Sequence, residues 1–563
     1  MSLRVVQVLP DVSALDRAFD YDVPEKFADA VSVGSVVRID LHGRRVRGWV
    51  VAEGAGVGAY ETRKPIAKVS PGRVPPELVA LSEWAAWRWA GRRRSLLATA
   101  SSASNASPTR LLASTSPPSG SSMPKVGDGW VGEAFSKDRS VVRLGPAIDP
   151  WPVIEAAARR GPALVLVPSV ARVERVTRRL RDARLSGVTV GARAGAWAPC
   201  GGLASVVVLD AHDEVYAEER APTWNAWVVA AERAARARVP CVLVSATPTL
   251  DQLAWGELVE TDRATERDGW SKIEVVDRRG DDPRTGLWSS RVVDVLRASE
   301  RALCVLNRTG RARLLSCSSC GTVSTCEKCA AAVHQDDAKQ LVCTRCGTTR
   351  PTVCQNCGAS RLKLLRIGTT RAAEELRALL GDDVGEVTGA STEVPDTRVI
   401  VGTEAILHRV GRADAVVFVD LDAELSAPFF RANEAALALL ARASRVVRGR
   451  LGDGQIVVQT RQPEHPVLRA AIASDPSRLA ELDEPMRREL ALPPFAALAH
   501  VTGEGAPAFV DGVRGQTGVE VIGPDERGAY LLRGADDAVL CDALARVARP
   551  AERTRVSVDP IRV

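Results

Sequence analysis

The stretch from residue 317 to 358, CSSCGTVSTCEKCAAAVHQDDAKQLVCTRCGTTRPTVCQNCG, says more about the fold than any other part of the chain. It holds eight of the twelve cysteines, arranged as four Cys-x2-Cys pairs. Such a pair places both sulfurs on one side of a tight turn, and eight thiolates can fill two tetrahedral zinc sites. Four thiolates leave no open coordination position, so we expect both zinc ions to be structural.

The spacing leaves open which pairs share a zinc ion. Sequential pairing would leave a loop of only five residues between the first two pairs, which is short for a zinc ribbon, so we expect nested pairing. Glycine follows three of the four pairs, where a positive φ is needed to complete the turn. The first zinc would be held by Cys317, Cys320, Cys354 and Cys357, and the second by Cys326, Cys329, Cys343 and Cys346.

Length and composition indicate a multidomain globular protein. The 563 residues exceed one compact core and suggest about three or four domains. A net charge of +6 permits nucleic-acid binding without requiring it. The first residues, MSLRVV, lack the basic start of a signal peptide, and no run reaches the ~18 apolar residues of a membrane span. We therefore expect a cytoplasmic protein with reduced thiols.

Apolar runs outside the cysteine block predict strands. Residues 163–168, 206–210 and 240–245 have the continuous apolar pattern of buried parallel strands, and 170–180 has that of a helix between them. The pattern returns at 302–306, 399–401 and 415–420, which predicts two doubly wound α/β units. Short alternating runs before residue 70 predict a small β-barrel, followed by a Trp-rich helix over 76–97 and a flexible linker over 98–123.

Further motifs accompany the cysteine block. They lie at 15–21 with Val23-Pro24, at 36–39 with 43–48, at Ser245-Ala246-Thr247-Pro248, at 306–310, at Val401-Gly402-Thr403, at 419–422 with 428–434, and at 492–495. Together they resemble the family of bacterial primosomal protein N′, PriA, the replication-restart DNA helicases of superfamily 2. The resemblance covers nearly the whole chain apart from about 98–135.

The resemblance implies two RecA-like doubly wound helicase lobes with a double-zinc insertion, an N-terminal small β-barrel that binds DNA 3′ ends, and a C-terminal α+β domain. We expect the β domain at 1–70, a helical, reduced winged-helix-like region with the linker at 71–135, lobe 1 at 136–290, lobe 2 at 291–460 with the zinc insertion at 314–362, and the C-terminal domain at 461–563.

The resemblance also implies a set of DNA contacts. Phe19, Asp20, Gly43 and Lys64 match positions at which the family binds the 3′ end of a nascent strand. The residues alone would favour a core aromatic for Phe19 and a turn cap for Asp20. Arg44 and Arg45, on an expected loop, and the arginines at 92–94 are candidates to neutralise phosphates or to form a solvated basic face.

The motifs that would hold a nucleotide are degraded. Residues 141–152, where a P-loop belongs, contain one glycine and no lysine. Leu209 stands where the metal-binding Asp of Walker B is expected, with Asp210 in the position of the following Glu. The last helicase motif keeps Arg445 and Arg448 but loses its Gln and both glycines. We therefore expect a degenerate, actinobacterial-type member that lacks Walker A and does not hydrolyse ATP.

Three functions remain open at this stage. The first, which we favour, is a replication-restart factor that binds forked or branched DNA and recruits other primosome and replisome-loading proteins without unwinding. Single-stranded DNA-binding protein is a further candidate partner, and we expect a nucleoid-associated protein in the cytoplasm with no membrane partner. The alternatives are an active ATP-dependent 3′–5′ helicase and a zinc-dependent scaffold without a DNA role.

Overall fold

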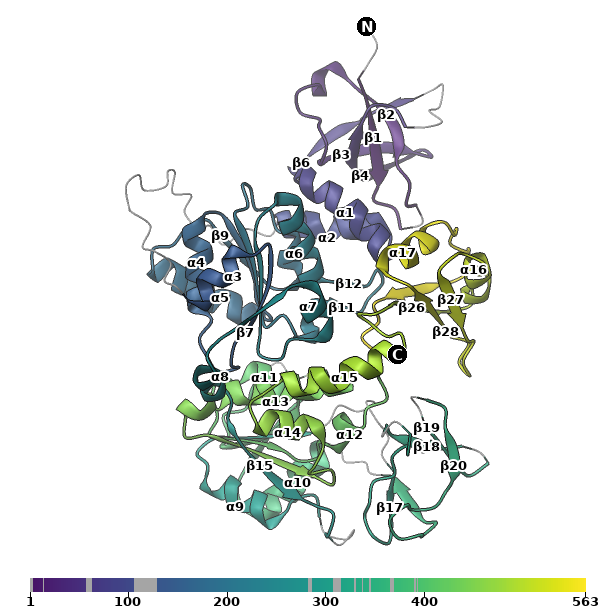
Figure 1. The fold of residues 1–563 in the computed structure, drawn as a ribbon. Coiled ribbons are helices and arrows are strands. Elements are labelled where there is room, and N and C mark those ends of the chain that lie inside the picture. Colours follow the sequence, from purple (N-terminus) through teal and green to yellow (C-terminus); the bar gives the residue numbers. More distant parts are fainter. Residues whose placement is uncertain are drawn as a thin grey trace.

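A computed structural model describes residues 4–13, 15–56, 63–105, 129–281, 286–306, 315–328, 331–336, 338–343, 346–364, 369–388, 391 and 393–562. These residues form seven sheets, arranged as connected modules that run from purple to yellow in Figure 1. Among the helices of these residues, none is long and apolar enough to cross a membrane.

The N-terminal module is a six-stranded sheet that closes on itself. Its strands are β1 (Arg4–Pro10), β2 (Phe19–Val23), β3 (Ser35–Leu41), β4 (Arg44–Glu53), β5 (Lys64–Pro65) and β6 (Lys68–Arg73). The strand order is β5-β2-β1-β4-β3-β6, yet the two outermost strands follow each other directly in the chain. Ile66 donates to the carbonyl of Asp22 (3.0 Å) and Ala67 to that of Arg38 (3.0 Å), so this segment joins the two edges into a barrel.

Two helices follow where one helix and a linker were expected. They are α1 (Pro76–Arg88) and α2 (Arg93–Asn105), separated at Ala90, whose φ is +43°. The prediction of a flexible linker was wrong for residues 98–105. Helix α2 continues because Leu97 and Ala100 are buried and the Trp49 indole donates to Ser101 Oγ (2.6 Å). The rest of the expected linker, 106–123, lies outside the described residues.

Lobe 1 is an all-parallel sheet with helices on both faces. Its strands, in the order β14-β7-β13-β10-β8-β9, are β7 (Arg139–Arg143), β8 (Ala163–Leu166), β9 (Val188–Gly191), β10 (Ser205–Leu209), β13 (Cys241–Ser245) and β14 (Glu257–Glu260). Its helices are α3 (Trp130–Ser136), α4 (Trp151–Arg160), α5 (Val170–Asp182), α6 (Ala226–Ala237), α7 (Leu250–Trp255) and α8 (Arg263–Gly269). A small ribbon, β11 (Ala217–Glu218) with β12 (Trp224–Asn225), lies before α6. The strands predicted at 163–168, 206–210 and 240–245 are confirmed.

Alternate residues of these strands point to opposite faces. Leu164 and Val206 pack with α6 and with α1 and α2, whereas Val165 and Val207 pack with α3, α4 and α5. The first of these cores continues into the N-terminal barrel and the C-terminal sheet. One apolar core therefore joins three modules around α1 (Figure 1).

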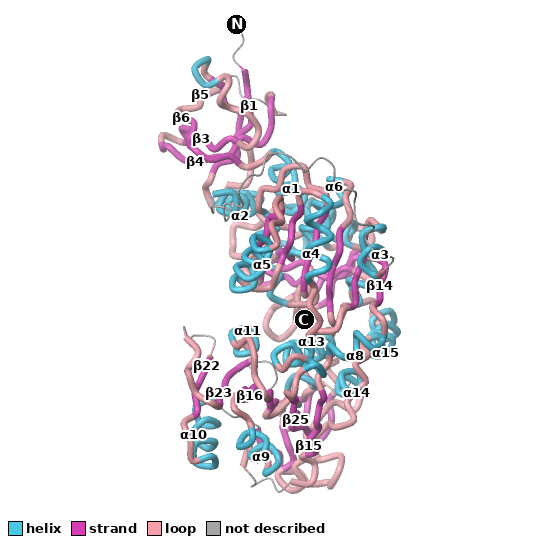
Figure 2. Tube along the Cα trace, turned by 90° about the vertical axis from the view of Figure 1, so that its left-hand side faces the viewer, coloured by secondary structure: helices cyan, strands magenta, loops and turns pink. Residues whose placement is uncertain are grey.

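Lobe 2 repeats the design below lobe 1 (Figures 1 and 2). Its parallel strands, in the order β15-β25-β24-β16-β23-β22, are β15 (Lys272–Asp277), β16 (Ala302–Leu306), β22 (Val384–Val387), β23 (Val399–Thr403), β24 (Ala415–Phe418) and β25 (Gln455–Thr460). Its helices are α9 (Ser290–Ala298), α10 (Thr369–Leu380), α11 (Ile406–Arg409), α12 (Asp422–Leu425), α13 (Ala432–Val446), α14 (Pro466–Ile472) and α15 (Ser477–Glu489). Helices α9 and α10 cover one face and α13 and α14 the other, so both lobes are doubly wound.

Two smaller units complete the chain. The insertion after β16 pairs β17 (Leu315–Cys317) with β21 (Leu362–Leu364) and encloses the ribbon β18 (Val333–Gln335), β19 (Gln340–Cys343) and β20 (Thr349–Pro351). The C-terminal unit is an antiparallel sheet in the order β27-β28-β26-β29, formed by β26 (Ala497–Thr502), β27 (Val519–Ile522), β28 (Tyr530–Gly534) and β29 (Arg555–Val558) with α16 (Ala506–Val513) and α17 (Asp537–Ala545). The insertion projects from lobe 2, away from the barrel (Figure 1).

Candidate functional site

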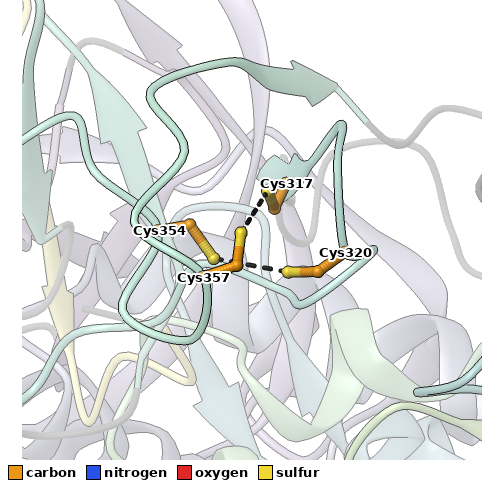
Figure 3. A group of neighbouring side chains, drawn as sticks. All are labelled: Cys317, Cys320, Cys354 and Cys357. Atoms are coloured by element: carbon orange, nitrogen blue, oxygen red, sulfur yellow. Dashed lines mark hydrogen bonds between the residues drawn. The ribbon is translucent and has the colours of Figure 1, made fainter.

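The four outer cysteines of the insertion form one cluster. The sulfurs of Cys317, Cys320, Cys354 and Cys357 all lie within 4.8 Å of one another and converge from the two ends of the insertion (Figure 3). The sulfurs of Cys317 and Cys357 are 3.5 Å apart, as are those of Cys320 and Cys354. A zinc ion with four bonds of about 2.3 Å sets sulfur separations of about 3.8 Å, so the cluster has the size that a tetrahedral ion needs.

The inner cysteines gather separately. Cys326, Cys343 and Cys346 bring their sulfurs within 4.8 Å, and the sulfurs of Cys326 and Cys346 are 3.5 Å apart. Cys329, the fourth ligand expected here, lies outside the described residues. The outer pairs thus lie together, and so do cysteines of the inner pairs, which is the nested arrangement.

The turn chemistry expected at these pairs is present. Gly321, Gly347 and Gly358 have φ values of +73°, +69° and +74°. Each of the three amides donates to the carbonyl of the first cysteine of its pair, at 3.0, 3.1 and 2.9 Å. Three knuckles therefore share one local geometry that only glycine adopts without strain.

Backbone and side-chain donors surround the sulfurs. The amides of Ser319, Lys328 and Cys346 each donate to a cysteine sulfur at 3.4 Å. A hydrogen bond with the Thr322 side chain contributes most to lowering the pKa of Cys320 to about 6. These donors favour the thiolate form at Cys320. At Cys357 the hydrogen bond from the Ala359 amide lowers the pKa, but the hydrogen bonds with Cys320 and Cys317 outweigh it and raise the pKa to about 12, as expected when four thiols crowd one site.

Two of the predicted DNA-binding positions meet at one carboxylate. Lys64 Nζ lies 2.7 Å from Asp40 Oδ1, and the Gly43 amide donates to the same oxygen (3.2 Å). The hydrogen bond with Lys64 is the main cause that holds the pKa of Asp40 below its ordinary value. His42 and Gly43 both have positive φ, as a two-residue hairpin turn requires. Sequence reasoning missed Asp40, although its place just before this turn was a signal.

Phe19 and Asp20 begin β2, beside the strand that carries Lys64. Both side chains are half-buried, and the Arg17 guanidinium lies 4.7 Å from the centroid of the Phe19 ring. Asp20 Oδ1 accepts from the Gly56 amide (3.0 Å). Phe19 packs against the barrel core as the residues alone would suggest, yet it and Asp20 both keep part of their side chains at the surface.

The arginines differ from expectation in two respects. Arg44 and Arg45 are exposed, but they begin strand β4 rather than lying on a loop, because the turn is completed by His42 and Gly43. The arginines at 92–94 are engaged within the protein: Arg94 pairs with Asp11 (2.8 Å), and the other two bond to loop and helix carbonyls. Arg92 and Arg94 tie the start of α2 to the segment after β1, and Arg93 ties α2 to α1, so these three do not form a phosphate-binding cluster.

The loop in the P-loop position is closed by its own contacts. It joins β7 to α4 and runs from residue 144 to 150. Pro150 and Pro152 supply no amide at the start of α4, and the Trp151 amide donates to Asp149 Oδ1 (3.0 Å). A Cβ on Gly145 would lie 2.7 Å from the carbonyl oxygen of Glu266. Without a lysine or a row of free amides, this loop lacks the parts of a phosphate cradle.

Asp210, at the end of β10, faces two arginines. Arg445 of α13 donates to both of its oxygens, at 2.7 Å for the Nη1–Oδ2 contact, and Arg172 of α5 donates to Oδ2 as well. Burial alone would raise the pKa of Asp210, but the attraction of Arg172 and Arg445 lowers it well below its usual range. Both oxygens of Asp210, which stands in the Walker B glutamate position, are therefore hydrogen-bonded to guanidinium groups, while Leu209 in the metal-binding position offers no carboxylate.

A second ion pair between the lobes lies beside the contact of Arg445 with Asp210. Arg442 Nη2 donates to Asp213 Oδ2 (2.9 Å), and His212 Nδ1 lies 2.8 Å from Ser245 Oγ. Burial lowers the pKa of His212 to about 4, so the ring is neutral at neutral pH. Sequence reasoning missed Arg172, Arg442 and Asp213. The only signal was that Arg442 belongs to the degraded last motif.

Comparisons with known proteins agree with this architecture. The family model of the 3′ DNA-binding domain of PriA matches residues 7–101, which contain the barrel and nearly all of α1 and α2. Two parallel, doubly wound lobes behind such a module, with a cysteine-rich insertion in the second, define a helicase-like protein. The resemblance inferred from the motifs is confirmed: this chain is a relative of the replication restart proteins PriA.

Three relatives illustrate the range of similarity. The replication restart protein PriA of Thermotoga maritima is 26% identical over 443 residues, 68% of this chain and 59% of its own length. The Bacillus subtilis protein is 26% identical over 409 residues, 65% and 49%. The probable replication restart protein PriA of Mycobacterium leprae is 27% identical over 572 residues, 87% and 86%. The chain thus spans only about half to three fifths of the first two relatives.

Among solved structures, S. cerevisiae Dbp5 bound to RNA and ADP BeF3 aligns over 63% of this chain and 89% of its own, with 9% identity. Its TM-score is 0.34, too low to bear on the function.

Proposed function

We propose that this chain is a replication-restart factor that binds the 3′ end of a nascent strand at forked or branched DNA and recruits primosome and replisome-loading proteins without ATP-driven unwinding. The observation that carries the proposal is the match of residues 7–101 to a 3′ DNA-binding domain. The proposal includes RecA-like helicase lobes, action at the nucleoid in the cytoplasm, and the five-domain division given above with one correction. Lobe 2 extends from about residue 272 to 489 instead of 291 to 460, because β15 belongs to its sheet and α14 and α15 pack in its core.

The barrel offers the groups that such recognition needs. Within the described residues, the one protein hydrogen bond to the Asp20 carboxylate is at Oδ1, which leaves Oδ2 to accept from a 3′-hydroxyl. A 3′-phosphate has no such donor and would place like charge beside the carboxylate. Exposed Arg44 and Arg45 stand on the same module to neutralise backbone phosphates. Partly exposed Phe19 supplies a ring on which a base can stack.

Zinc is the metal that the cysteine clusters suit best. All described ligands are thiolates, and a tetrahedral all-sulfur site selects zinc or iron–sulfur chemistry. We assign one zinc to the outer cluster and one to the inner cluster, with Cys329 as the fourth inner ligand. The outer ion would hold the start and end of the insertion together, and the inner ion would stabilise its ribbon. The insertion projects from lobe 2 and offers a surface for partner proteins, with single-stranded DNA-binding protein among the candidates (Figure 1).

The loop at 144–150 and the contacts of Asp210 support the proposed absence of ATP-driven work. Phosphoryl transfer depends on placed cations and amides around the phosphates and on a carboxylate that orients Mg²⁺. Here the amides of Leu144, Ala147 and Ile148 donate to carbonyls of the protein itself. Leu209 offers no carboxylate to Mg²⁺, and the neighbouring Asp210 is bound by Arg445. The helicase alternative therefore lacks support from the site, and the scaffold alternative does not account for the 3′ DNA-binding match.

The test compares two forks that differ only at the nascent 3′ end. Fluorescence anisotropy with the full chain should show tighter binding to the 3′-hydroxyl fork than to the 3′-phosphate fork. Asp20→Asn should remove most of this preference, while Asp29→Asn, which changes an exposed carboxylate of the same module, should leave it intact. Equal binding of both forks by the wild-type chain would refute 3′-end recognition.

A further inference from the structure

Helix α13 of lobe 2 is attached to lobe 1 at both of its ends. Before its first turn, Arg431 pairs with Asp251 (3.0 Å), and within that turn Glu434 Oε1 accepts from the Leu250 amide (2.9 Å). Near its last turn, Arg442 and Arg445 reach the end of β10. The helix between these points is largely buried. Contacts at both ends restrict rotation of one lobe against the other more than a single contact would.

The contacts of Arg445 replace those expected in a motor. In nucleotide-driven enzymes, an arginine finger approaches a phosphate, and the phosphate is what makes the contact favourable. In this chain Arg445 finds its anion in Asp210 and also donates through Nε to the carbonyl of Pro146 (2.8 Å), in the degraded P-loop. Asp210 has a φ of +52°, a conformation that aspartate adopts more readily than most residues. Its carboxylate thereby meets the arginine of the other lobe.

We propose that α13 is a nucleotide-independent clamp, in which the Arg445–Asp210 and Arg442–Asp213 ion pairs hold the two lobes in one relative orientation. Asp210 supplies within the protein the negative charge that a phosphate supplies in a motor. Parting the lobes would break hydrogen-bonded ion pairs whose two carboxylates are buried: Asp213 would lose its arginine partner, and Asp210 would keep only Arg172. Leaving a buried charge with fewer partners is costly. The clamp goes beyond fork binding and does not depend on it.

Hydrogen–deuterium exchange on the full chain, with small-angle X-ray scattering, tests the clamp. In the double variant Arg442→Gln/Arg445→Gln, amides of residues 206–213 and 432–446 should exchange at least about tenfold faster, and the radius of gyration should increase. Mg·ATP added to the wild-type chain should change neither quantity. Arg236→Gln removes an exposed ion pair with Glu232 on α6 and should match the wild type in both measurements.

Two results would overturn the clamp. One is a double variant whose α13 exchange and radius equal those of the wild type. The other is a wild-type chain in which Mg·ATP strengthens protection of α13. If the double variant loses protection in the sheets as well, the single variant Arg445→Lys decides. Lysine keeps the positive charge but lacks the planar fork with which arginine donates to both oxygens of Asp210. The clamp predicts faster exchange in α13 with the sheets still protected, and any other result overturns it. Fork binding is measured separately, so failure of the clamp leaves 3′-end recognition untouched.

Discussion

Replacing Cys354 by serine should release one zinc ion and loosen the base of the insertion. Cys354 is only 3% exposed, and its sulfur lies 3.5 Å from that of Cys320, inside the outer cluster. A serine hydroxyl at this position does not supply the thiolate that a zinc site of this kind uses as a ligand. Structural zinc sites have apparent binding free energies of about 10–16 kcal/mol. Divided equally among four ligands, this is roughly 3 kcal/mol per thiolate, or about a 100-fold loss of affinity.

The assay is zinc content per chain after dialysis against a chelator of intermediate strength. The wild-type chain should retain two zinc ions and Cys354→Ser only one, with faster hydrogen exchange at residues 315–317, where β17 pairs with β21. Cys200→Ser, which changes a cysteine outside both clusters, should retain two. Two tightly held ions in Cys354→Ser, or none in the wild type, would refute the assignment.

Three further predictions concern the lobes and the barrel. Gly402→Ala should destabilise lobe 2 by about 1–3 kcal/mol in urea unfolding, because its Cβ would lie 2.2 Å from a backbone oxygen of β22, whereas Gly411→Ala, which has open space, should not. Between pH 6.5 and 4 the unfolded chain protonates His212 while the folded chain does not, so stability falls as pH falls through this window. His212→Gln should reduce that loss between pH 7 and 5.5 by up to about 1 kcal/mol, since the ring is part-exposed; an unchanged pH profile would contradict this. Arg44→Gln and Arg45→Gln should each lower the slope of log affinity for forks against log salt by about 1, and an unchanged slope would remove that arginine from the interface.

Local patterns predicted much of the fold. Strands β8, β10 and β13 were visible as apolar runs because a strand buried on both faces has no polar alternation. The geometry of the knuckles followed from Cys-x2-Cys-Gly, because a turn of that length has few solutions. Helix α2 was missed since its serines resemble a linker, and its stability comes from tertiary burial of Leu97 and Ala100.

The inter-lobe contacts could not be predicted from sequence. Asp210 and Arg445 are 235 residues apart, and no local pattern states that they meet. The motifs showed only that a nucleotide site had lost its parts. What replaced it depends on the packing of two lobes, which brings the surviving arginine to the carboxylate left beside it. The internal contacts of the arginines at 92–94 were equally unpredictable, because their partners, such as Asp11 for Arg94, lie far away in the sequence.

The most direct test of whether this two-lobed protein binds forks without hydrolysing ATP is its ATP turnover, measured on the purified full chain with saturating 3′-hydroxyl forks. The account predicts fork binding with a hydrolysis rate no higher than that of a matched sample without protein. Fork-stimulated hydrolysis by the same preparation, in proportion to the amount of chain, would contradict it.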